Sequence, residues 1–199
     1  MKVNEIFSSF QGEGPYAGLP ATFLRLSGCN LNCDFCDTDF DDYKELSVEL
    51  VKESILQHCK NNNTPLLVIT GGEPLLQYEE LKKLIEELDY SNLTIQIETN
   101  GSIRRIPISP VSYVISPKKN IRQIFEFYKD YDMSFFKFII TEQKDIDLIK
   151  ELQKDYDYDE LIWVQSEYSK ADELTSLILS NNMDNIRISG QLHKYLKQQ

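Results

Sequence analysis

Short runs of β-branched and aromatic residues alternate along this chain with stretches whose apolar residues recur at helical spacing. The runs predict strands at 21–27, 65–70, 93–98, 113–116, 135–140 and 161–165. The stretches between and after them predict helices at 48–60, 77–88, 119–130, 144–154 and 170–181. The chain therefore consists of repeated strand–helix units.

Repeated strand–helix units predict a mainly parallel sheet whose helices lie outside it and whose crossovers are right-handed. About six strands in 199 residues are too few for a closed eight-unit barrel, which typically needs about 250 residues. We therefore expect an α/β fold, an incomplete and open (β/α) barrel of about six mainly parallel strands. Residues 1–199 are expected to form a single domain, because no linker or repeat divides them.

Composition narrows the classes of partner. The formal net charge of −11 disfavours nucleic acid, because a surface of that sign repels phosphate backbones. Lys118, Lys119 and Arg122 form the longest basic cluster, which is suited at most to a small anionic ligand. No apolar run reaches the roughly 18 to 20 residues of a membrane span, and no secretory segment is evident, so we expect a protein of the cytoplasm.

Three of the four cysteines lie within eight residues, with the spacing C-x3-C-x2-C at Cys29, Cys33 and Cys36. Structural zinc sites and iron–sulfur clusters usually have four protein ligands, so three clustered thiolates predict an iron–sulfur site with one iron left open. Zinc would need a distant fourth ligand, and the candidates are Cys59, His58 and His193. No second pair of ligands exists, which disfavours zinc, and Cys59 follows the apolar face of a predicted helix as a core thiol would.

The predicted strand at 65–70 ends in a second distinctive loop, Thr70-Gly-Gly-Glu-Pro74. Adjacent glycines let the backbone approach a ligand closely, and the glutamate offers a carboxylate to an amine. By itself such a loop is an ordinary turn before a helix. Its position one strand–helix unit after the cysteines favours a shared site, since the carboxyl ends of parallel strands meet at one edge.

The cysteine spacing followed by a strand ending in Gly-Gly-Glu resembles the radical S-adenosylmethionine (SAM) superfamily. The resemblance implies a [4Fe–4S] cluster on Cys29, Cys33 and Cys36, with SAM on the open iron. It implies that an electron from the cluster cleaves SAM to a 5′-deoxyadenosyl radical, which abstracts hydrogen from the substrate. It also implies a set of SAM-binding residues: Phe35, Cys36, Asp37, Gly72, Glu73, Ser116, Pro117 and Lys118.

Within that superfamily, the chain resembles the 7-carboxy-7-deazaguanine synthase family of queuosine and deazapurine biosynthesis. The motifs that carry this resemblance are Phe10-Gln-Gly-Glu-Gly14, Phe23-Leu-Arg-Leu-Ser-Gly-Cys29, Cys36-Asp-Thr38, Thr70-Gly-Gly-Glu-Pro74, Ile97-Glu-Thr-Asn-Gly101, Ser116-Pro-Lys118 and Gln191-Leu-His-Lys194. They imply a lyase that converts 6-carboxy-5,6,7,8-tetrahydropterin to 7-carboxy-7-deazaguanine by a radical ring contraction with loss of ammonia. The resemblance further implies a low-potential electron donor such as a flavodoxin or ferredoxin, and a homodimer.

The same resemblance implies contacts with substrate from six residues: Phe10, Gln11, Gly12, Glu13, Arg25 and Thr70. Arg25 would pair with the substrate carboxylate, and an ion pair with an acidic side chain of the protein is the structural alternative. Thr38 would bind Mg2+, an ion that prefers hard oxygen ligands. Glu98 at a strand end and His193 near the C-terminus are further candidates without an assigned role.

Two other functions share some of these residues. An activase that makes a glycyl radical on a partner protein would use the three cysteines and the Gly-Gly-Glu loop, but has no evident need for Gln11, Arg25 and Thr38 together. A zinc-binding interaction module would use the cysteines alone.

Anaerobic reconstitution with iron and sulfide is expected to give a brown protein with about four irons, because three thiolates at this spacing favour an open cubane. Metal analysis and visible absorption measure the outcome. A colourless protein with one tightly bound zinc would contradict the iron–sulfur interpretation.

Overall fold

The computed structural model describes residues 1–33, 36, 42–88, 92–166 and 170–196. Their strands are β1 (Lys2–Phe10), β2 (Pro20–Leu26), β3 (Lys44–Glu45), β4 (Leu66–Gly71), β5 (Thr94–Thr99), β6 (Ser112–Ile115), β7 (Ser134–Ile139), β8 (Ile162–Gln165) and β9 (Ile186–Ile188). Their α-helices are α1 (Val48–Asn62), α2 (Tyr78–Glu86), α3 (Ile121–Tyr128), α4 (Gln143–Asp155), α5 (Ala171–Ser180) and α6 (Leu192–Leu196). Two short 3-10 helices are η1 (Gly14–Tyr16) and η2 (Pro74–Gln77).

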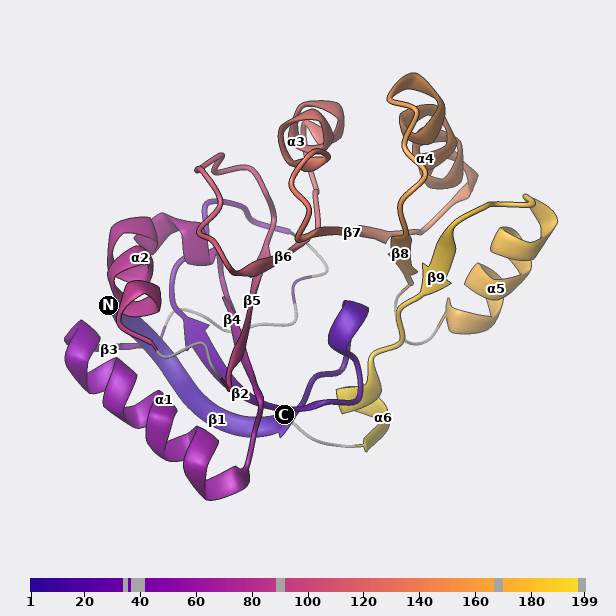
Figure 1. Cartoon of the computed structure of the whole chain (residues 1–199). Helices are drawn as coiled ribbons and strands as arrows, with labels where there is room; N and C mark the ends of the chain where they lie inside the picture. The colour runs from indigo at the N-terminus through magenta and orange to yellow at the C-terminus, as the bar shows by residue number, and fades with distance from the viewer. Residues whose placement is uncertain (34–35, 37–41, 89–91, 167–169, 197–199) are drawn as a thin grey trace.

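These strands form one sheet in the order β3-β1-β2-β4-β5-β6-β7-β8-β9. From β2 to β9 every neighbouring pair is parallel, whereas β1 runs antiparallel to both β2 and β3. Figure 1 shows the sheet as an open arc with α1 to α5 along its outer side. The open, mainly parallel barrel predicted from the sequence is confirmed.

The six predicted strands and five predicted helices are all present, with ends that differ by one or two residues. The predicted number of strands was too low, because the sheet holds nine in the described part of the chain. β3 and β9 have two and three residues, which is too short for a hydrophobic pattern to register. β1 lies between β3 and β2, and its partly buried residues alternate poorly.

Local sequence explains where the helices begin and end. Ser47 caps α1, since its side chain accepts a hydrogen bond from the backbone N–H of Leu50 at 3.3 Å. Asn63 ends the same helix in the left-handed conformation, with φ at 49°. At the start of α4, Glu142 and Asp145 form a capping box.

The main core lies between the outer face of the sheet and the helices. Each central strand contributes alternate apolar residues to it, as Leu67 and Ile69 do on β4, while α1 contributes Val51 and Ile55. Cys59 on α1 packs against this core and its Sγ lies 3.5 Å from Thr22 Oγ1, at the end of β2 away from the cysteine loop. The prediction that Cys59 is a core thiol is confirmed.

Hydrogen bonds between described residues cross the open side of the arc. The backbone N–H of Gly14 donates to Ser189 Oγ at 3.0 Å, and the N–H of Leu192 donates to the carbonyl of Gly12 at 3.1 Å. They join the loop after β1 to the segment that follows β9, where η1 and α6 lie in Figure 1. No helix of the described residues is both long and apolar enough to cross a membrane.

Replacing Phe125 with alanine is expected to lower the free energy of unfolding by about 3–5 kcal/mol. The ring is fully buried and stacks on Phe136 with centroids 4.4 Å apart, so its removal leaves a cavity between α3 and the sheet. Urea unfolding measures the loss. Phe127→Ala is the matched control on the same helix. Because Phe127 is 41% exposed, its loss should cost no more than about 0.5 kcal/mol, and equal losses would contradict this packing.

Candidate active site

The inner face of the sheet is apolar near one end of the strands and polar near the other. Near the amino ends of β2 and β4 it is apolar, with Ala21, Phe23, Leu66 and Val68 in a small buried cluster. Toward the carboxyl ends the inward positions are polar. We call this set the inner wall; its members are Glu5, Arg25, Thr70, Gln96, Glu98, Lys137 and Gln165. Polar side chains from six strands therefore gather above the apolar floor.

The cysteine loop follows β2 at the same end of the sheet. Cys29, Cys33 and Cys36 form no disulfide. The backbone N–H of Cys36 donates to the Cys33 carbonyl at 3.1 Å, and the N–H of Leu31 donates to Cys29 Sγ at 3.4 Å. Burial raises the pKa of the Cys29 thiol, and the nearby charges of Glu73, Cys33 and Cys36 raise it further. The three thiols thus lie within electrostatic reach of one another.

The thiols are not already arranged around a point in space. Among the described residues no group of three His, Cys, Asp or Glu side chains has the geometry of a metal site. Their chemistry still fits an iron–sulfur cluster, because none of the three is held in a disulfide and soft thiolate ligands suit iron. Metal binding displaces the thiol protons.

The Gly-Gly-Glu loop is locked against the cysteine loop through the backbone. The N–H of Gly72 donates to Leu26 O at 3.0 Å, and the N–H of Glu73 donates to Gly28 O at 2.8 Å. A Cβ on Gly71 would lie 2.0 Å from Leu26 O, and one on Gly72 would lie 2.0 Å from Gly28 O. Both glycines are therefore required by the close approach of two backbones, which places this loop beside Cys29.

Glu73 is fully buried, and its carboxylate holds neighbouring loops together. Oε1 accepts hydrogen bonds from Leu75 N at 3.0 Å and Thr99 Oγ1 at 2.7 Å, while Oε2 accepts one from Asn100 N at 2.8 Å. Burial raises the pKa of Glu73 and these hydrogen bonds oppose the rise. The predicted contact between Glu73 and a methionyl amine stays a prediction, because the structure engages this carboxylate with the protein.

Asn100 extends the connection to the cysteine loop. Its Nδ2 donates to Asn30 Oδ1 at 3.1 Å, and Asn30 Nδ2 donates to Ser102 Oγ at 2.8 Å. Because Asn30 immediately follows Cys29, the end of β5 helps to fix the first cysteine. Neither asparagine was singled out from the sequence, although Asn100 lies inside the quoted motif Ile97-Glu-Thr-Asn-Gly101.

Glu98 collects three donors on the inner wall. Gln11 Nε2 donates to its Oε1 at 2.9 Å, Gln96 Nε2 to the same oxygen at 3.2 Å, and Thr70 Oγ1 to Oε2 at 2.9 Å. Gln11 is 2% exposed and also accepts from the N–H of Glu13 at 3.2 Å through its Oε1. Two residues predicted to contact substrate, Gln11 and Thr70, are therefore brought together by a third that had no assigned role.

Arg25 lies on the inner wall with a protein partner. Its Nη1 forms an ion pair with Glu5 on the neighbouring strand, and its guanidinium lies 5.1 Å from the ring centroid of Phe7. The structural alternative considered for Arg25 is thus present in the structure. The residue is still about one quarter exposed along its side chain, so part of the guanidinium remains accessible.

Glu13 lies across the wall from Arg25 and binds two residues that sequence reasoning missed. Lys137 Nζ forms an ion pair with Glu13 Oε2, and Gln165 Nε2 donates to Glu13 Oε1 at 3.2 Å. Burial lowers the pKa of nearby Lys118 to about 8, and the charge of Lys137 contributes to that shift. The signal for Lys137 was a lysine within the apolar strand Phe-Phe-Lys-Phe-Ile-Ile.

Two amide oxygens of the wall lack hydrogen-bond partners among the described residues, Gln96 Oε1 and Gln165 Oε1. Their orientation is defined, because each amide nitrogen donates to a carboxylate, Glu98 and Glu13 respectively. A buried acceptor without a donor costs about 1–3 kcal/mol. The inner wall therefore contains two hydrogen-bond acceptors without donors among the described residues, and a ligand rich in N–H groups would supply the donors.

The other predicted site residues are placed as follows. Phe10 ends β1 and is 46% exposed, and Gly12 is buried beside it. Ser116, Pro117 and Lys118 follow β6, where Lys118 Nζ donates to Ser116 Oγ at 2.6 Å. Phe35, Asp37 and Thr38 lie outside the described residues, as does the side chain of His193.

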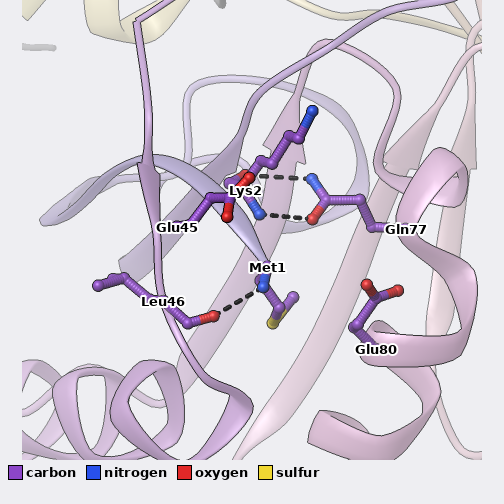
Figure 2. Close-up of a pocket in the computed structure, with 6 residues that line it drawn as sticks. All are labelled: Met1, Lys2, Glu45, Leu46, Gln77 and Glu80. Carbon is purple, nitrogen blue, oxygen red and sulfur yellow. Dashed lines mark hydrogen bonds between the residues drawn. The ribbon is translucent and has the colours of Figure 1, made fainter.

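Figure 2 shows a pocket of about 450 Å³ away from the inner wall, lined by Met1, Lys2, Glu45, Leu46, Gln77 and Glu80. Gln77 Oε1 accepts from Lys2 N at 2.7 Å, and its Nε2 donates to the carbonyls of Lys2 at 3.1 Å and Ser27 at 3.3 Å. None of the predicted site residues lines this pocket.

Comparison with known proteins agrees with the family resemblance found in the sequence. A family model described as the radical SAM superfamily matches residues 24–140. The 7-carboxy-7-deazaguanine synthase of Hyperthermus butylicus is 43% identical over 122 residues, which cover 59% of this chain and 52% of that protein. The enzyme of the same name from Rickettsia prowazekii is 41% identical over 122 residues, covering 59% and 51%.

A solved structure extends the similarity over the chain. The crystal structure of QueE from Escherichia coli matches with a TM-score of 0.69 and 26% identity, and covers 94% of this chain and 92% of that one. By sequence, the chain spans about half the length of the curated relatives it matches.

Glu73→Gln is expected to remove a pH dependence of stability. Because the pKa of Glu73 is raised in the folded state, the unfolded chain, with a pKa of about 4.3, releases the proton first. The wild-type free energy of unfolding should therefore fall relative to that of the variant as pH rises from about 4.3 through the raised folded pKa. Urea unfolding across this range measures it, with exposed Glu86→Gln as matched control. A wild-type curve parallel to that of Glu73→Gln would contradict the expectation.

Proposed function

Because this chain belongs to the radical SAM superfamily, we propose that it converts 6-carboxy-5,6,7,8-tetrahydropterin to 7-carboxy-7-deazaguanine with loss of ammonia, as a carbon–nitrogen lyase of queuosine or deazapurine biosynthesis. Support comes from relatives named for that synthase activity and from the similarity to QueE over nearly the whole chain.

The observation that carries the proposal is the acceptor-rich inner wall beside the cysteine loop. A tetrahydropterin presents an amino group and several ring N–H groups, so its edges need acceptors. Glu98 and Glu13 offer carboxylates, and Gln96 and Gln165 have amide oxygens without partners among the described residues. This wall faces the interior of the open barrel at the end that bears the cysteines.

The cofactors have residues suited to them. Cys29, Cys33 and Cys36 would hold a [4Fe–4S] cluster. SAM would contact the backbone at Gly72 and the residues Glu73, Ser116, Pro117 and Lys118, together with Phe35, Cys36 and Asp37 of the cysteine loop. When bound, the pair supplies a 5′-deoxyadenosyl radical that abstracts hydrogen from substrate. Lys118 would attract the SAM carboxylate, and since burial lowers its pKa to about 8, that attraction weakens in alkaline solution.

Arg25 would receive the substrate carboxylate. In the structure Glu5 pairs with Nη1 of Arg25. The planar guanidinium group has five N–H donors, so a second carboxylate can bind beside Glu5 or in its place. Phe10, Gln11, Gly12 and Thr70 would contact the pterin rings. Thr38 would supply a hydroxyl ligand to Mg2+, which could also bind the substrate carboxylate.

The proposal includes partners. A low-potential protein such as a flavodoxin or ferredoxin would deliver the electron, and the chain would act as a homodimer; both rest on the family resemblance. Cysteines that form no disulfide support a reducing compartment, for which we propose the cytoplasm.

Reconstituted protein with reductant, SAM and carboxytetrahydropterin is expected to yield 7-carboxy-7-deazaguanine anaerobically, at a higher rate with Mg2+. Mass spectrometry of the product and of 5′-deoxyadenosine measures the reaction. Cys33→Ser should abolish both products because it removes a cluster ligand, whereas Cys59→Ser should retain activity within about twofold, since Cys59 packs in the core.

Two outcomes would contradict the proposal. The first is 5′-deoxyadenosine that forms only when a partner protein is added, which would indicate a glycyl-radical activase. The second is activity that survives Cys33→Ser.

A further inference from the structure

Three polar side chains beside the cysteine loop have no role in the steps proposed above. Asn100 Nδ2 donates to Asn30 Oδ1 at 3.1 Å, and Asn30 Nδ2 donates to Ser102 Oγ at 2.8 Å. The backbone N–H of Ser102 donates to Asn100 Oδ1 at 2.8 Å. These hydrogen bonds close a ring, which we call the asparagine ring. It joins the cysteine loop to the loop that follows β5, 70 residues further along the chain.

The orientation of each amide in the asparagine ring is defined by its partner. A backbone N–H only donates, so Asn100 turns Oδ1 toward Ser102 and has Nδ2 left for Asn30. Asn30 accepts that bond through Oδ1 and has its own Nδ2 left for the Ser102 hydroxyl. The ring is therefore a specific arrangement, in which each side chain fixes the next.

One side of the asparagine ring stands on a rigid turn. The backbone N–H of Asn100 donates to Oε2 of the buried Glu73 at 2.8 Å, and that of Gly101 donates to Thr99 Oγ1 at 3.0 Å. Gly101 has φ at 71°, and a Cβ there would lie 2.6 Å from Ile124 Cγ2. The turn is thus held by hydrogen bonds and packed closely against α3, which gives Asn100 a fixed base.

The other side of the asparagine ring is attached to the first cysteine, because Asn30 directly follows Cys29. Before Cys29, the carbonyl of Gly28 accepts from the N–H of Glu73 at 2.8 Å. The Cys29 Cβ lies 3.1 Å from the position that a Cβ on Gly72 would take. The chain is therefore tied to neighbouring loops on both sides of Cys29, and the protein itself sets the position of this thiol.

We propose that Asn100 is a positioning residue for the iron–sulfur cluster, which holds Cys29 through the asparagine ring as a preplaced first ligand onto which Cys33 and Cys36 close. This inference rests on the proposed function, because it concerns the cluster which that function requires. Among the described residues the three thiols do not share the geometry of a metal site, so they must come together when a cluster binds. Fixing one of them beforehand lowers the conformational entropy lost in that step.

The proposal predicts a local effect with little change in overall stability. The bonds from Asn100 to Asn30 and from Asn30 to Ser102 are exposed, and an exposed hydrogen bond is readily replaced by one to water. Breaking the ring should therefore loosen the chain around Cys29 without unfolding the sheet. A residue with a merely structural role would instead lower overall stability and cluster retention together.

Alkylation of the cluster-free protein by iodoacetamide, followed residue by residue with mass spectrometry, tests the placement of Cys29 without any cofactor. Asn100→Ala is expected to speed alkylation of Cys29 at least about threefold, since the thiol becomes more accessible, while Cys59 in the core changes by less than about twofold. Asn61→Ala is the matched control. Asn61 is exposed in the last turn of α1, and its loss should leave both rates within about twofold of wild type.

Iron release measures the same effect in the reconstituted holoprotein. Excess EDTA is added anaerobically, and the decay of visible absorption gives the rate. Asn100→Ala should lose iron at least about fivefold faster than wild type, because residues that support metal ligands contribute strongly to metal affinity. The thermal midpoint of the cluster-free variant should stay within about 3 °C of wild type. Asn61→Ala should release iron at the wild-type rate.

A second substitution in the asparagine ring shows whether Asn100 acts through Asn30. Asn30→Ala should also speed alkylation of Cys29 at least about threefold, and it keeps the test decisive if Asn100→Ala does not fold. The double variant should release iron at a rate within about twofold of that of Asn100→Ala, because a ring that is already broken has no further effect to lose.

Four outcomes would overturn the proposal. The first is an unchanged rate at Cys29 in Asn100→Ala or Asn30→Ala, and the second is equal acceleration at Cys29 and Cys59. The third is iron release from Asn100→Ala at the wild-type rate. The fourth is a pair of effects that multiply in the double variant.

Turnover of carboxytetrahydropterin by the wild-type protein is measured in parallel. If the wild-type protein forms deazaguanine while Asn100→Ala retains its iron as wild type does, the positioning role is contradicted and the function stands. If the variants behave as described but the wild-type protein with its cluster forms no deazaguanine, the function is contradicted and the positioning role stands.

Discussion

The close approach of two backbones at Gly71 and Gly72 is the constraint on which the rest of the site depends. These residues extend the parallel pairing of β2 and β4 past the ends of the strands, where no side chain fits between them. This close approach fixes the start of the cysteine loop relative to β4. Glu73 then uses a buried carboxylate to join the same loop to Thr99 and Asn100, so three strand ends form one rigid edge.

Beside that edge, the inner wall is organised by pairs of charges. The chain as a whole carries a net charge of −11, yet the two cations of the inner wall as defined above are each paired with a carboxylate, Arg25 with Glu5 and Lys137 with Glu13. Burying such pairs contributes little to stability, because desolvation offsets their attraction. Such pairs matter for the geometry of the site, since a paired and hydrogen-bonded carboxylate keeps one orientation.

The sequence-based prediction was accurate where the interactions lie between residues close in the sequence, and it failed where they join residues far apart in the sequence. Strands and helices were placed within one or two residues, because side-chain periodicity, the cap at Ser47 and the Gly-Gly turn are local signals. β3 and β9 were missed because two or three residues carry no period and are held by pairing with distant strands. The resemblance correctly identified the superfamily, since the cysteine spacing and the Gly-Gly-Glu loop are likewise local.

By itself the sequence determined an open parallel barrel, three thiols with one ligand missing, and a set of polar strand ends. It did not determine the partners of those polar groups. Lys137 meets Glu13, and Glu98 gathers Gln11, Gln96 and Thr70, only because the strand order brings them to one face of the curved sheet. Such pairings depend on register and distance in space, which no local pattern contains. For this reason the cysteines could be found in the sequence, whereas the inner wall is a property of the tertiary structure.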